Sequence, residues 1–123
     1  MDERALSREA LLRAAWREIL ATTPGNVRNF PAADRAIAAG AAVDDVVTAM
    51  RAASYETAFR LLYLVSSVHA PDDQNERDIN LGWALIDFDL RHSPSGPRSA
   101  LEGVHEDLLE ADPSGRGSAD LWD

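Results

Sequence analysis

The stretch that decides the fold is Val43 to His69, VDDVVTAMRAASYETAFRLLYLVSSVH, which contains neither proline nor glycine. Its apolar side chains recur every three or four residues, which is the spacing of a helix with a buried face. Asp44 and Asp45 fall in the first turn, where carboxylates favour the positive end of the helix dipole. We therefore expect a central helix over about residues 43–69, roughly 40 Å long, around which the other elements pack.

The second half of this helix is apolar on almost every side. One stripe runs along its whole length, with the members Val43, Val46, Val47, Met50, Ser54, Thr57, Ala58, Leu61, Leu64, Val65 and Val68. A second set, the Tyr55 patch, lies on roughly the opposite side and consists of Tyr55, Phe59, Leu62 and Tyr63. A helix that is apolar all round is buried on both sides. Either other elements of the chain cover the Tyr55 patch, or a second subunit does, and the patch is then the interface of a homodimer.

Three further helices are expected around the central one. The first covers about residues 2–22 and carries Trp16 on its apolar face. The second covers about residues 31–39, because a proline suits its first turn and a glycine follows its end. The third covers about residues 100–111, where a capping box precedes an apolar stripe, although Gly103 weakens it. The fold class is therefore mainly α, with four helices in total.

One short strand is expected in addition, which makes the class α+β. In the segment LGWALIDFDL, residues 81–90, apolar side chains alternate with other residues, as in a strand with one buried face. A helix is the alternative for this segment. A strand over about residues 82–90 needs a partner for its backbone groups. That partner is either another segment in a small sheet or the same strand of a second copy.

The chain of 123 residues has the length of one domain. We expect residues 1–111 to form a single helical domain and residues 112–123 to form a C-terminal tail. The tail has one apolar pair, Leu121-Trp122, which either docks on the helical body or leaves the tail frayed.

Charge is distributed very unevenly along the chain. Residues 1–70 hold 8 acidic and 8 basic side chains, whereas residues 71–123 hold 13 acidic and 4 basic ones. The formal net charge of −9 therefore falls entirely in residues 71–123. This balance argues against nucleic acid, whose binders carry basic patches, and it permits a basic protein partner. A well-solvated surface without a partner is the alternative reading.

Several other classes of protein are disfavoured by composition. The chain has no cysteine, and hence no disulfide, thiolate metal ligand or cysteine nucleophile. Its beginning lacks the apolar region of a secretory signal, and no apolar run approaches the roughly 18 residues that span a membrane. Its glycines form neither a phosphate loop nor a dinucleotide motif, so no cofactor is expected. The cytoplasm is the expected location.

One set of residues could support chemistry. Asp87 and Asp89 would point the same way on a strand, and paired carboxylates can bind a divalent cation or share a proton. His105 and Glu106 could complete such a site. The spacing is not diagnostic, and a structural role for the histidine, half-buried on an apolar stripe, is the preferred interpretation.

The sequence therefore favours a small protein-binding module, of the inhibitor or immunity type, over an enzyme. Its acidic C-terminal surface would face a basic partner protein, and the candidate residues are Asp87, Asp89, Glu106, Asp107 and Glu110. The first alternative is a small metal-binding protein or hydrolase that uses Asp87, Asp89, His105 and Glu106. The second is a structural homodimer joined through the Tyr55 patch.

Overall fold

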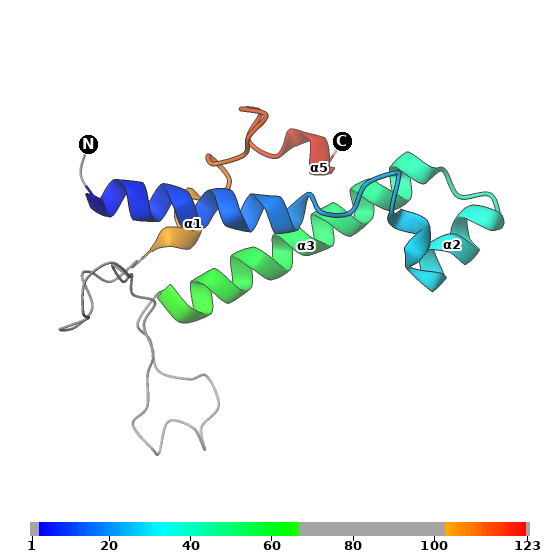
Figure 1. Cartoon of the computed structure of the whole chain (residues 1–123), viewed down its shortest axis with the longest axis horizontal. Helices are drawn as coiled ribbons and strands as arrows, with labels where there is room; N and C mark the ends of the chain where they lie inside the picture. The colour runs from blue at the N-terminus through cyan, green and yellow to red at the C-terminus, as the bar shows by residue number, and fades with distance from the viewer. Residues whose placement is uncertain (1–2, 67–102, 123) are drawn as a thin grey trace, which may run out of the picture.

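The computed structural model describes residues 3–66 and 103–122, and these residues are mainly helical (Figure 1). The elements in chain order are α1 (Glu3–Ile19), the 3-10 helix η1 (Val27–Asn29), α2 (Pro31–Ala38), α3 (Val43–Ser66), the 3-10 helix η2 (Val104–Asp107) and α5 (Ala119–Trp122). No strand occurs among the described residues. The strand predicted over about residues 82–90 lies outside them.

The predicted central helix is confirmed as α3, which runs for 24 residues without a break. At about 1.5 Å per residue it is roughly 36 Å long. It runs antiparallel to α1, and the two form the body of the molecule (Figure 1). The last residues predicted for this helix, 67–69, lie outside the described part of the chain.

The predicted first helix is confirmed as α1, which ends at Ile19, slightly before the expected boundary. The side chain of Asn26 holds the turn that follows. Its Oδ1 accepts a hydrogen bond from the Thr23 backbone N–H at 2.8 Å, and its Nδ2 donates to the Ala21 carbonyl at 2.8 Å. These bonds occupy backbone groups that a longer helix would use.

The predicted second helix is confirmed as α2, with Pro31 in its first turn. It ends in a Schellman motif, because Gly40 donates to the Ile37 carbonyl and Ala41 donates to the Ala36 carbonyl, both at 3.0 Å. Gly40 has a φ of +110°, a region that residues with a Cβ avoid. The glycine therefore turns the chain from α2 into α3.

The α-helix predicted over about residues 100–111 is wrong where the structure describes it. Gly103 adopts the left-handed conformation with a φ of +70°, which no right-handed helix accommodates. Only Val104–Asp107 is helical, with 3-10 geometry, and turns follow it. This arrangement buries Val104, His105 and Leu108 together. Packing of these three side chains therefore determines the local backbone.

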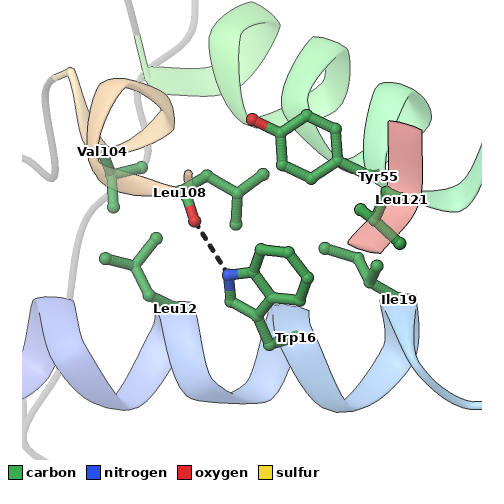
Figure 2. Close-up of a cluster of buried hydrophobic side chains, with 7 residues drawn as sticks. All are labelled: Leu12, Trp16, Ile19, Tyr55, Val104, Leu108 and Leu121. Carbon is green, nitrogen blue, oxygen red and sulfur yellow. Dashed lines mark hydrogen bonds between the residues drawn. The ribbon is translucent and has the colours of Figure 1, made fainter. Parts of the chain in front are cut away.

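The main core lies between α1 and α3 and is completed by the segment around η2 and by α5 (Figure 2). Its buried members are Leu12, Trp16, Ile19, Tyr55, Val104, Leu108 and Leu121. A second, smaller core joins η1, α2 and the beginning of α3 through Val27, Ala33, Ile37 and Val47. Leu121 is buried, so α5 docks on the body, which is the first of the two outcomes considered for the tail.

In the second half of α3, the side that faces the core is that of the Tyr55 patch and not that of the apolar stripe. Tyr55 is only 7% exposed, and Phe59 and Leu62 pack against the same core. Leu61 and Leu64, which the apolar stripe placed on the principal buried face, are 56% and 40% exposed. Elements of the same chain therefore cover Tyr55, and the expected burial of Leu61 and Leu64 is corrected.

Candidate protein-interaction surface

Three of the five residues predicted to form an acidic surface are described by the structure. Glu106 and Glu110 are exposed on and just after η2. Asp107 lies between them, and its Oδ2 accepts a 2.6 Å hydrogen bond from Nε of Arg8 on α1. Asp107 therefore joins the C-terminal segment to α1 in addition to carrying charge. Asp87 and Asp89 lie outside the described residues.

Asp112 organises the loop that leads into α5. Its Oδ1 accepts a hydrogen bond from the Ser114 N–H at 2.9 Å, and its Oδ2 accepts from the Ser114 hydroxyl at 2.8 Å and the Ser118 N–H at 2.7 Å. Burial acts to raise the pKa of this carboxyl. The hydrogen bonds and the charge of Arg116 outweigh that effect, so the pKa lies below its usual 3.8. We did not predict this role from the sequence, although the Asp-Pro-Ser-Gly run signals a turn.

Glu106 and Glu110 differ from the other acidic residues of the described C-terminal segment. Asp107 pairs with Arg8, Asp112 holds its loop, and Asp120 pairs with Arg116 at 2.9 Å. Within the described residues, neither glutamate takes part in an ion pair. Leu109 lies between them in the chain and is 41% exposed. We call Glu106, Leu109 and Glu110 the acidic patch.

His105 and Glu106, two candidates for a catalytic or metal site, lie in different environments. His105 is buried, with its ring edge-on to Phe59 at 5.3 Å and to Tyr63 at 4.9 Å between centroids. Glu106 is exposed. Among the described residues, no three histidine, aspartate or glutamate side chains come close enough together to hold a metal ion. The aromatic contacts explain the histidine as part of the core.

The four residues of the Tyr55 patch are not equally accessible. The Tyr55 ring lies 5.8 Å from Trp16, 6.4 Å from Phe59 and 6.1 Å from Trp122, measured between centroids. Burial, and then the Glu56 carboxylate, raise the pKa of the Tyr55 hydroxyl above 10.0. Tyr63 is 48% exposed. The patch is thus an internal seam at Tyr55 that reaches the surface at Tyr63.

Two hollows on the described surface have volumes above about 400 Å³. One lies between α1 and α3, has a volume of about 410 Å³ and is lined by Glu18, Ile19, Ala53, Ser54, Thr57, Ala58 and Leu61. The other lies beside α1, has a volume of about 490 Å³ and is lined by Arg13, Trp16, Arg17, Leu20, Ala111 and Pro113. The sequence did not indicate either hollow, because each joins residues that are distant in the chain.

None of the described helices is both long enough and apolar enough to cross a lipid bilayer. Comparisons with protein-family models, with curated proteins and with solved structures find no match to this chain.

Proposed function

We propose that this chain is a small protein-binding module that presents its acidic patch to a basic partner protein. The observation that supports the proposal is the exposure of the Glu106 and Glu110 side chains. Both carboxylates are exposed, and within the described residues neither is paired with a cation. A cationic surface would therefore meet them without breaking an ion pair of the fold.

The charge of the chain as a whole supports the same proposal. All of the formal charge of −9 falls in residues 71–123, where Glu106 and Glu110 also lie. An electrostatic potential of one sign over a protein surface raises the rate of association with an oppositely charged partner. It also discriminates against partners of the same charge. The exposed Leu109 adds apolar area beside the two charges. Interfaces combine an apolar centre with charged residues at the rim in this way.

A matched pair of charge-removing variants tests the proposal. The first is the double variant Glu106→Gln/Glu110→Gln. The control is Asp44→Asn/Asp45→Asn, which removes the same charge from exposed positions in the first turn of α3. This turn lies at the other end of α3 from the segment around η2 (Figure 1). Each protein is immobilised and used to capture basic proteins from a native lysate, and a captured partner is then purified for titration calorimetry.

We expect the wild type and the control to bind the same partner and the glutamine variant to bind it at least about 10-fold more weakly. That change corresponds to about 0.7 kcal/mol for each charge removed. Affinity should also fall as salt rises to about 0.5 M, where charges are screened within a few ångströms. Equal binding by the glutamine variant contradicts the proposal. An affinity that does not change with salt concentration also contradicts it, as does a failure to retain any basic protein.

A further inference from the structure

The hollow beside α1, which we call the α1 hollow, joins two segments that lie far apart in the chain. Four of its lining residues come from the second half of α1 and its end, and the other two, Ala111 and Pro113, come from the loop after η2. The 2.8 Å hydrogen bond from Trp16 to the Leu108 carbonyl holds the two segments together. The Ala111 N–H in turn donates to the carbonyls of Asp107 and Leu108. The walls of the hollow are therefore fixed by the fold itself.

The size and lining of the α1 hollow are those of a site for a small molecule. Its volume of about 490 Å³ lies within the range of roughly 300–1,000 Å³ that ligand pockets occupy. Apolar side chains form most of the lining, namely those of Trp16, Leu20, Ala111 and Pro113. Such sites combine apolar walls with a few polar groups that orient the ligand. In the α1 hollow the polar groups are two guanidinium groups.

These guanidinium groups belong to Arg13 and Arg17, which lie one helical turn apart and therefore on the same side of α1. Both residues are exposed. Arg17 takes part in no ion pair with another described residue. Arg13 lies 3.6 Å from Glu9, and both of these side chains are more than half exposed. Because an exposed ion pair of this kind stabilises little, both arginines are available to a bound anion.

The nearest acidic residues do not neutralise the α1 hollow. Glu18 follows Arg17 in the chain but lines the other hollow, between α1 and α3. Asp112 lies between two lining residues, and its carboxylate oxygens accept hydrogen bonds from Ser114 and Ser118 in its own loop. The lining therefore carries two positive charges and no negative one, in a chain whose formal net charge is −9. This local reversal of charge favours an anionic ligand.

We infer that the α1 hollow binds a small organic carboxylate with an apolar body. A guanidinium group donates two parallel N–H bonds to a carboxylate, and the apolar walls accept the rest of the molecule. Arg17 lies in the last turn of α1, where the helix dipole places partial negative charge. A ligand with one negative charge therefore fits this end of the helix better than a doubly charged phosphate. The inference is independent of the acidic patch, none of whose residues lines the hollow.

The first experiment compares two probes of the same shape, 2-naphthoate and the neutral 2-naphthamide, by NMR titration of the ¹⁵N-labelled protein. We expect 2-naphthoate to bind with a Kd of about 1 mM or lower and 2-naphthamide to bind at least about 10-fold more weakly. The backbone N–H signals of Leu20 and Ala111 should shift most, because these residues line opposite segments of the hollow. Equal affinity for the two probes overturns the inference. Shifts confined to other residues, or no saturation by about 5 mM 2-naphthoate, also overturn it.

The second experiment removes the arginines one at a time. Arg13→Gln and Arg17→Gln should each weaken 2-naphthoate binding at least about 5-fold, because each removes a charged hydrogen-bond donor. The control is Arg60→Gln on α3, since Arg60 is also exposed and also lies one turn from a glutamate, Glu56. It should change the affinity by less than about twofold. Unchanged binding in both test variants, or an equal loss in the control, overturns the inference.

A third variant fills the α1 hollow without changing its charge. Ala111→Phe places a large ring among the apolar walls and should weaken 2-naphthoate binding at least about 10-fold. Circular dichroism checks that this variant and the arginine variants stay helical. A folded Ala111→Phe variant that binds 2-naphthoate as the wild type does overturns the location of the site.

Discussion

The indole Nε1 of Trp16 donates a 2.8 Å hydrogen bond to the carbonyl oxygen of Leu108, which joins α1 to the C-terminal segment across 92 positions of the chain (Figure 2). The same carbonyl accepts the N–H of Ala111 at 3.2 Å. Leu108 is fully buried beside the indole, so the polar contact and the apolar contact act together. This pair fixes the turn after η2 against the body.

Replacing Trp16 with Phe should lower the free energy of unfolding by about 1–3 kcal/mol. The change removes one buried hydrogen bond and part of the ring volume. The Leu108 carbonyl keeps its bond to Ala111, which limits the loss. Urea unfolding followed by circular dichroism measures the effect. Trp122→Phe is the control, because Trp122 is 54% exposed, and it should cost less than about 0.5 kcal/mol. Equal losses in the two variants would show that the Trp16 bond has no special role.

Gly103→Ala should destabilise the protein by about 1–2 kcal/mol, because a Cβ disfavours the left-handed conformation of this residue. The added Cβ would lie 3.6 Å from the nearest atom, Oε2 of Glu106, so no clash contributes. Gly25→Ala provides the matched control, since Gly25 does not have a positive φ and its new Cβ also has 3.6 Å of space. Thermal unfolding of the two variants gives the comparison. A Gly103→Ala variant as stable as Gly25→Ala would contradict the backbone argument.

Gly103 also shows where sequence patterns stop being informative. The long helix α3 and the short α2 follow from local signals, such as Pro31, Gly40 and a repeat sustained over many turns. The segment after Gly103 has an apolar repeat too, but its spacing of three to four residues fits a 3-10 turn as well as an α-helix. The packing of Val104 and Leu108 against α1 and α3 decides between them. That packing depends on contacts that no local pattern contains.

The candidate surface shows the same limit. Exposure of Glu106 and Glu110 follows from their chemistry. The different role of Asp107 depends on Arg8, 99 positions earlier in the chain. On α3, apolar residues occur on both sides of the second half, so hydrophobicity alone did not indicate which side faces the core. The aromatic contacts of Tyr55 with Trp16 and Trp122 settle the question.

The Arg8–Asp107 ion pair should show a coupling free energy of about 0.5–1 kcal/mol in a double-mutant cycle, because both side chains remain partly exposed. The cycle compares wild type, Arg8→Gln, Asp107→Asn and the double variant by chemical unfolding. Salt at about 0.5 M should reduce the coupling through screening. The longer and more exposed Arg13–Glu9 pair, at 3.6 Å, should couple by about 0.3 kcal/mol or less. Equal coupling in the two cycles would contradict a structural role for Asp107.

Asp112→Asn should lower Tm by roughly 3–5 °C at neutral pH, because it weakens the hydrogen bonds to Ser114 and Ser118. The folded-state pKa of Asp112 lies below 3.8, so its stabilising effect is complete above that pH. It is lost as pH falls through the lower pKa of the folded protein. The Tm difference between wild type and variant should therefore shrink below pH 3.8. A difference that stays constant down to about pH 2 would show that ionisation of Asp112 does not stabilise the fold.

Phe59→Asp and Leu61→Asp should differ strongly in their effect on stability, although the two residues lie only two positions apart on α3. Phe59 is partly buried and packs against the main core, with its ring 6.4 Å from Tyr55 and 5.3 Å from His105, so a carboxylate there loses apolar contacts and is partly desolvated. We expect a loss of about 3 kcal/mol or more in the free energy of unfolding, measured by urea unfolding. Leu61 is 56% exposed, so Leu61→Asp should change this quantity by less than about 0.5 kcal/mol. Equal losses in the two variants would contradict the packing of Phe59 against the main core.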